Sequence, residues 1–323
     1  MTLPNPTAGW GTHRRATRVR KHAGVVTCAA LVLGAAVVVA VVKSYTPAQS
    51  DQFTRPVHYL GVYERTAPNS YVGVDQFAQT IGRQPNLVSY YSSWLEPFQA
   101  GFAATAAQHG AVPLVQINPA HASLAAIASG KFDVYLRAYA AAVRAYGHRV
   151  ILSFGHEMNG WWYSWGYRHT SPKVFVAVWR HIVTLFRSVG ADNVTWLWTI
   201  NVIHLSGGIV APAPWWPGRS YVNWVGIDGY YHKSSWRFAP LFGPTIKTVR
   251  ALTRDPILIA ETGVAPVAGK PAKIADLFSG VRAYGLLGFV WFDANKKADW
   301  RVNSPAAIAA FRRGAQTYQR PAP

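Results

Sequence analysis

The chain has 323 residues, half of them hydrophobic and only 14% charged, and its formal net charge is +19. This composition permits a large buried core and excludes a chain that is disordered throughout, because disordered segments are poor in apolar residues. The single cysteine, Cys28, excludes disulfides within the chain and any zinc site built on several cysteines.

The N-terminal part predicts a membrane anchor. Residues 1–22 contain four arginines and one lysine between positions 14 and 21, and the next twenty residues carry no charge. Twenty apolar residues in a helix span a hydrocarbon core of about 30 Å. We therefore expect a basic cytoplasmic segment at 1–22 and a transmembrane anchor at 23–43, with the rest of the chain outside the cell. The alternative is a cleaved signal sequence and a secreted protein, although the apolar region of a signal peptide is usually only about 7–15 residues long.

Positive charge continues beyond this segment. Residues 44–323 contain 26 Lys and Arg against 13 Asp and Glu. Such an excess favours contact with an acidic surface or polymer, and it is also compatible with solvated arginines that have no special partner. A nucleic acid is not expected as a partner, because the domain is predicted to be exported and no nucleic-acid-binding motif is evident.

Eight apolar runs alternate with helical patterns between a linker at 44–56 and a tail at 317–323. Repeated strand–helix units predict a parallel sheet, and eight of them predict a closed (β/α)8 TIM barrel at residues 57–316, close to the roughly 250 residues typical of that fold. The predicted strands are Tyr59–Tyr63, Leu87–Tyr91, Val112–Ile117, Val150–Phe154, Val194–Thr199, Trp224–Asp228, Ile257–Ala260 and Gly288–Phe292.

Three of the intervening helices have clear sequence signals. The first is predicted at Phe132–Tyr146, and one of its faces is formed by the small apolar residues Val134, Ala138, Ala141 and Ala145. The second follows Ser171, a suitable N-cap, and ends at Gly190, and the third covers Ala272–Tyr284.

Two of the four glutamates of the chain each follow an apolar run. Glu157 comes shortly after Val150–Phe154, and Glu261 directly follows Ile257–Ala260. A carboxylate at the end of a buried strand costs desolvation energy, which favours a functional role. The carboxyl ends of all barrel strands meet at one face, so both side chains are predicted to reach the same cavity. Two carboxylates in one cleft are what glycosidic bond hydrolysis requires.

The two surroundings predict different protonation states. Glu157 lies beside three tryptophans and a tyrosine in the segment His156–Gly166. Apolar surroundings raise the pKa of a carboxyl group, so Glu157 is predicted to donate a proton to a departing oxygen. Glu261, held ionised by hydrogen bonds, is predicted to attack the anomeric carbon.

Other residues at strand ends are candidate substrate contacts. His156 could hydrogen-bond the substrate or position Glu157, and Tyr230 could donate a hydrogen bond to Glu261 and keep its pKa low. Asp228 could bind a sugar hydroxyl or orient another side chain, and Asn201 could hold the sugar 2-OH. The remaining candidates are Trp162, Trp291 as a stacking platform or else a core tryptophan, and His121 as a cleft residue or else a solvated loop residue.

No metal and no cofactor are expected. No two histidines have the spacing of a zinc-binding pair, and the glycines form no phosphate-binding loop.

The segment His156–Gly166 resembles the acid/base segment of glycoside hydrolase family 26, which includes β-1,4-mannanases and β-1,3-1,4-glucanases. The resemblance extends from about Val57 to Phe311, through motifs such as Trp198–Asn201, Val225–Tyr230 and Ile259–Gly263. It implies a clan A barrel and a retaining mechanism.

In that resemblance, Glu157 corresponds to the acid/base and Glu261 to the nucleophile. Tyr230 matches a tyrosine that contacts the nucleophile, Asp228 matches its motif partner, and Trp162 matches a tryptophan that lines the cleft. Many β-mannanases of the family carry an arginine four residues before the acid/base. This chain has Ser153 there, a departure that favours the glucan-type members.

The sequence therefore predicts a membrane-tethered, monomeric, retaining endo-β-glycanase that acts outside the cell on a β-mannan or β-glucan. One alternative is a non-catalytic envelope protein that binds or assembles polysaccharide on a glycosidase-like barrel. Another is an anchored hydrolase that trims polymer during the cell's own polysaccharide export.

Overall fold

The computed structural model describes residues 59–203 and 208–318. The predicted basic segment at 1–22, the anchor or signal sequence at 23–43 and the linker at 44–56 lie outside the described residues, as does most of the tail predicted at 317–323. Within the described ranges, none of the helices combines the length and the apolar character needed to cross a membrane.

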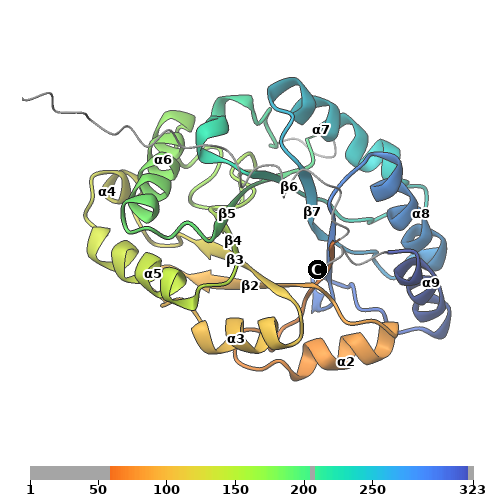
Figure 1. The fold of residues 1–323 in the computed structure, drawn as a ribbon. Helices are drawn as coiled ribbons and strands as arrows, with labels where there is room; N and C mark the ends of the chain where they lie inside the picture. The colour runs from red at the N-terminus through yellow and green to blue at the C-terminus, as the bar shows by residue number, and fades with distance from the viewer. Residues whose placement is uncertain (1–58, 204–207, 319–323) are drawn as a thin grey trace, which may run out of the picture. The chain divides into compact units, whose positions relative to one another are not determined.

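Eight parallel strands form a barrel in chain order (Figure 1). Strand β1 pairs with both β2 and β8, which closes the barrel. This arrangement confirms the predicted (β/α)8 architecture. Four strands extend one or more residues further at the carboxyl end than predicted. The strands are β1 (Tyr59–Tyr63), β2 (Leu87–Ser93), β3 (Val112–Asn118), β4 (Val150–Phe154), β5 (Val194–Asn201), β6 (Trp224–Asp228), β7 (Ile257–Thr262) and β8 (Gly288–Phe292).

Helices surround the barrel on its outside (Figure 1). They are α2 (Val72–Ile81), α3 (Ala100–Gln108), α4 (Leu124–Ala128), α5 (Asp133–Tyr146), α6 (Pro172–Ser188), α7 (Phe238–Leu252), α8 (Lys270–Ala283) and α9 (Pro305–Gln316). Two short 3-10 helices, η1 (Ala213–Trp215) and η2 (Arg219–Tyr221), lie between β5 and β6. After β8 the chain forms a small hairpin from β9 (Asn295–Lys296) and β10 (Ala298–Asp299).

The predicted start of α6 is confirmed, because the Ser171 side chain accepts a hydrogen bond from the backbone N–H of Val174. The predicted apolar face of α5 is wrong. Val134 is 87% exposed and the three alanines of that face are exposed as well. The helix instead buries its larger side chains, Leu136, Tyr139 and Val143, because burying these removes more apolar surface from water than burying alanines would.

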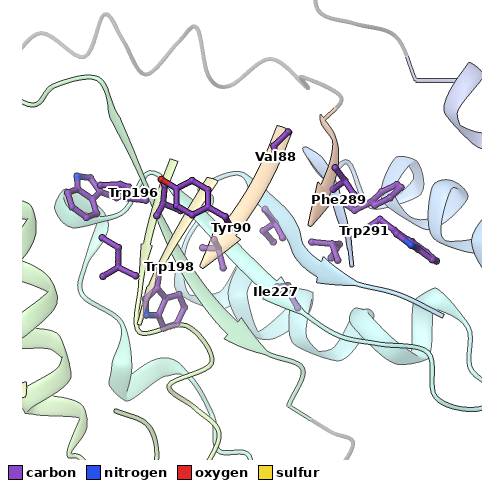
Figure 2. Packing of buried hydrophobic residues seen from close by; sticks show 14 of the residues in the cluster. Val88, Tyr90, Trp196, Trp198, Ile227, Phe289 and Trp291 are labelled. Carbon is purple, nitrogen blue, oxygen red and sulfur yellow. The ribbon is translucent and has the colours of Figure 1, made fainter. Parts of the chain in front are cut away.

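Side chains alternate along the strands between two packing layers. On β8, Phe289 and Trp291 belong to the large core cluster that also contains helix residues such as Phe311, whereas Val290 belongs to a separate cluster made almost entirely of strand residues. Figure 2 shows outward-pointing members of the large cluster, including Tyr90, Trp196 and Trp291. Adjacent residues of a strand point to opposite faces, so this alternation decides which residues of a strand end can reach the barrel mouth.

Candidate active site

A cleft of about 270 Å³ lies where the carboxyl ends of the strands meet. It contains both glutamates that the sequence singled out, together with Trp162, Asn201 and Tyr230. The full lining is Tyr91, Glu157, Trp162, Tyr163, Asn201, Tyr230, His232, Glu261, Phe292, Lys296, Lys297 and Trp300. The topology of the barrel therefore brings together residues that are far apart in the chain.

A tight turn after β4 brings Glu157 into the cleft. Gly155 adopts φ 56°, and its backbone N–H donates to the carbonyl of Ile117. A Cβ at this position would lie 3.1 Å from atoms of both Phe175 and Trp165, so a side chain would crowd the turn as well as strain it. Glu157 itself has φ 55°, and its N–H donates to the carbonyl of Thr199 on β5 at 2.9 Å.

The Glu157 carboxyl group accepts two hydrogen bonds. Asn201 Nδ2 donates to Oε1 at 2.5 Å, and Trp162 Nε1 donates to Oε2 at 2.7 Å. Asn201 is itself fixed by Asn159, whose amide exchanges two hydrogen bonds with the Asn201 backbone, each of 2.9 Å. The carboxyl group is thus held in one orientation.

Burial first, and then the nearby charge of Glu261, raise the pKa of Glu157 to about 7, against the two hydrogen bonds, which lower it. The side chain is only 7% exposed. At neutral pH a large fraction of Glu157 therefore keeps its proton, as a general acid must.

The Glu261 carboxyl group accepts three hydrogen bonds. Tyr91 and Gln116 donate to Oε1, the latter at 2.8 Å, and Tyr230 donates to Oε2 at 2.8 Å. Burial raises the pKa of Glu261, while the bonds from the two tyrosines and the charges of Lys296 and Lys297 oppose this effect. The predicted bond from Tyr230 is confirmed, but the predicted low pKa is not, because desolvation outweighs the donors.

Both tyrosines remain donors across the physiological pH range. Burial and the charge of Glu261 raise the pKa of Tyr91 and of Tyr230 well above the ordinary value. Because Glu261 accepts three hydrogen bonds and lies near two lysines, its ionised form is stabilised more than that of Glu157. The environments therefore favour one protonated and one ionised carboxyl group.

His156 and Asp228 lie beneath the cleft rather than in its lining. His156 Nε2 lies 3.1 Å from the Tyr163 hydroxyl, and burial lowers the pKa of His156 to about 3, so the ring is neutral. Asp228 is fully buried, and neither of its carboxyl oxygens has a hydrogen-bond partner of normal geometry. Burial and then the charges of Glu261 and Glu157 raise the pKa of Asp228 well above its usual value, which favours the protonated form.

Trp291 and His121 do not line the cleft. Trp291 is completely buried, and its ring packs edge-on against that of Phe311 of α9, with 5.3 Å between the ring centroids. The expected stacking platform at Trp291 is therefore wrong, because alternation along β8 turns Trp291 towards the helices and the next residue, Phe292, towards the cleft. His121 is an exposed residue in the turn after β3.

Several residues of the site did not emerge from the sequence. Tyr91 and Gln116 are polar residues near the carboxyl ends of β2 and β3, and that position was a signal that could have identified them. Lys296 and Lys297 belong to a hairpin with no recognisable pattern. Across residues 59–203 and 208–318, no group of three or more His, Cys, Asp or Glu is arranged to hold a metal ion.

Comparison with known proteins identifies the family of the chain. Residues 135–304 match the model of Glycosyl hydrolase family 26. The chain is also 32% identical over 270 residues to Endoglucanase H of Acetivibrio thermocellus, an alignment that covers 78% of this chain. The aligned region spans only 30% of the length of that relative.

Solved structures share the fold at low sequence identity. The catalytic domain of a Bacillus sp. JAMB-750 GH26 endo-β-1,4-mannanase has a TM-score of 0.65 at 16% identity and covers 83% of this chain and 87% of its own. The Bacillus subtilis mannanase BCman has a TM-score of 0.62 at 18% identity and covers 84% of this chain and 89% of its own. At this identity the likeness supports the barrel architecture alone.

Proposed function

The chain belongs to glycosyl hydrolase family 26, and from this premise we propose that it is a retaining endo-β-glycanase. The observation that carries the proposal is the pair Glu157 and Glu261, which share one cleft in different hydrogen-bond environments. Two carboxyl groups, one protonated and one ionised, match the requirements of glycoside hydrolysis by double displacement.

In the proposed reaction, Glu261 attacks the anomeric carbon while Glu157 gives its proton to the oxygen of the departing sugar. The glycosidic bond breaks and an ester bond forms between the sugar and Glu261. Glu157, now ionised, removes a proton from a water molecule, which attacks the same carbon and releases Glu261. Two inversions at one carbon leave the anomeric configuration unchanged.

The donors around each carboxyl group support this division of roles. Tyr91, Gln116 and Tyr230 stabilise negative charge on Glu261 before attack and again when the ester is cleaved. Trp162 and Asn201 fix Glu157 in the orientation from which it donates its proton. We assign Trp162 a further role as a wall for the departing sugar, because it lines the cleft next to Glu157.

We place a β-glucan ahead of a β-mannan as substrate. The relative with 32% identity is named an endoglucanase. Ser153, where many β-mannanases of the family carry arginine, is fully buried, and its hydroxyl lies 3.0 Å from that of Thr199. We further propose that the protein acts as a monomer outside the cell, anchored through residues 23–43, or is secreted if that segment is cleaved.

A product assay with the full chain tests the proposal. Mannan, barley β-glucan, lichenan and xylan are incubated with the protein, and new reducing ends are measured. NMR of the first product is expected to show retained anomeric configuration. An inverted product would overturn the two-step mechanism, because inversion at the anomeric carbon results from a single displacement.

Two variants test the assignment of roles. Glu157→Gln and Glu261→Gln are each expected to abolish hydrolysis of these polysaccharides while the circular dichroism spectrum stays unchanged. Glu96→Gln, which alters an exposed glutamate outside the cleft lining, is the matched control. Full activity in either cleft variant would contradict the proposal. Binding of a glucan by the wild type without any release of reducing ends would favour the non-catalytic alternative.

A further inference from the structure

Two lysines line the proposed catalytic cleft. Lys296 and Lys297 line the cavity, and both are exposed. The Lys296 Nζ lies 5.8 Å from the ring centroid of Tyr91, the residue whose hydroxyl donates to Glu261. At least one ammonium group is therefore close to the position at which the glycosidic bond would be cleaved.

The backbone that carries these lysines is held in place. Trp300 Nε1 donates to the carbonyl of Lys296 at 2.9 Å, and the Trp300 N–H donates to the carbonyl of Ala294 at 3.1 Å. The Trp300 ring is 4% exposed, and its centroid lies 4.6 Å from that of Tyr230. The hairpin is thus anchored to a residue of the site itself, so the lysines stay at the cleft although their side chains are exposed.

Their charges have no salt-bridge partner in the part of the chain that the structure describes. Asp299, the acid on the same hairpin, is occupied by Arg301 at 2.8 Å and by Asn303 at 2.9 Å. The acids that line the cavity are Glu157 and Glu261, which the proposed reaction uses.

Binding a neutral sugar does not require two cations. Aromatic faces and neutral hydrogen-bonding groups suffice for sugar rings and hydroxyls, and this cleft already has them in Trp162, Tyr230 and Asn201. Two positive charges that line one cleft repel each other, and an anion bound in the cleft relieves that repulsion. A lysine acts as a compact point charge, which suits a single anionic group on a sugar.

We infer that Lys296 and Lys297 form a subsite for an anionic group carried by the glycan close to the cleaved bond, which makes an acidic glycan the preferred substrate. The group is a carboxylate, a sulfate or a phosphate, which share the same charge chemistry. This inference rests on the proposed function, because it names the substrate class of the same cleft.

The lysines have a second effect that the test must separate from the first. Their charges lower the pKa of Glu261, and that of Lys297 also lowers the pKa of Glu157. A change in those pKa values alters the rate on every substrate alike. The ratio of kcat/KM on an acidic glycan to kcat/KM on its neutral parent cancels this common effect and reports the subsite alone.

The experiment measures that ratio for barley β-glucan and its carboxymethylated, sulfated and phosphorylated forms at equal degrees of substitution. The wild type is expected to prefer at least one acidic form by about tenfold at low salt, and the preference is expected to shrink as salt screens the charges. In the double variant Lys296→Gln/Lys297→Gln the ratio falls by about tenfold. Lys247→Gln, on an exposed position of α7, is the matched control and keeps the wild-type ratio.

The same comparison is made for binding, with Glu157→Gln as the background and short acidic and neutral oligosaccharides as probes. Equal cleavage and binding of neutral and acidic forms by the wild type would overturn the inference and leave the proposed hydrolase standing. A preference that survives in the double variant would also overturn it. A binding preference that the double variant loses, without hydrolysis of any glycan, would support the inference and refute the proposed function.

Discussion

Replacing Glu157 by glutamine is expected to stabilise the protein at alkaline pH. Burial first, and then the charge of Glu261, raise the pKa of Glu157 from 4.5 to about 7. In the unfolded chain the carboxyl group loses its proton near its ordinary pKa. Between these two values the folded protein therefore holds more protons than the unfolded chain, and the free energy of unfolding falls as the pH rises through this window.

The size of the effect follows from the two pKa values. At about 1.4 kcal/mol for each tenfold change in proton affinity, ionised Glu157 costs the folded protein about 3 kcal/mol above pH 7. About 2 kcal/mol of this cost appears between pH 5 and pH 8, because part of the change has already occurred by pH 5. Glutamine has a similar shape and no charge to desolvate, so Glu157→Gln removes the cost.

Urea unfolding followed by tryptophan fluorescence at pH 5 and pH 8 measures the effect. The gain in unfolding free energy of Glu157→Gln over the wild type is expected to be about 2 kcal/mol larger at pH 8 than at pH 5. Glu96→Gln, at an exposed position, is the control that measures how the loss of a negative charge outside the cleft changes the free energy of unfolding. An equal pH dependence in the wild type and Glu157→Gln would refute the argument that burial holds a proton on Glu157.

Three further substitutions test individual contacts. Trp162→Phe removes a donor to the Glu157 carboxylate and is expected to move the alkaline limb of the pH–kcat/KM profile up by about one pH unit; an unmoved limb would contradict this. Tyr230→Phe removes a donor that lowers the pKa of Glu261, so the acid limb is expected to move up and kcat/KM at pH 5 to fall by about tenfold; an unchanged rate at pH 5 would count against the role of Glu261. Trp291→Phe is expected to lower the unfolding free energy by about 1–2 kcal/mol without changing KM, as a core residue should; a raised KM with unchanged stability would restore a place for Trp291 in the cleft.

Local sequence patterns were sufficient to predict the barrel and the position of the glutamates. Strand residues alternate and helical residues recur at short spacings, so the eight strands could be located from neighbouring residues alone. Once a closed parallel barrel is assumed, the carboxyl end of each strand must lie at one face. That rule by itself predicts that Glu157, Asn201, Tyr230 and Glu261 lie together.

Contacts between residues far apart in the chain determine the parts of the site that local sequence patterns do not predict. The donors Tyr91 and Gln116 lie 170 and 145 residues before the Glu261 that they bind. The choice between Trp291 and Phe292 as the cleft residue depended on the register of β8 within the closed barrel, because both are large aromatic residues at a strand end. The small hairpin after β8 adds Lys296 and Lys297 to the wall without any sequence signal.

The sequence by itself determined the order of strands and helices and the two acids at their ends, because these depend on residues that are neighbours in the chain. Only the tertiary structure decided how strongly each acid holds its proton, since that affinity depends on burial and on donors contributed by distant strands. It also decided which aromatic side chains line the cleft and which fill the core, since adjacent residues of a strand point to opposite sides of the closed barrel.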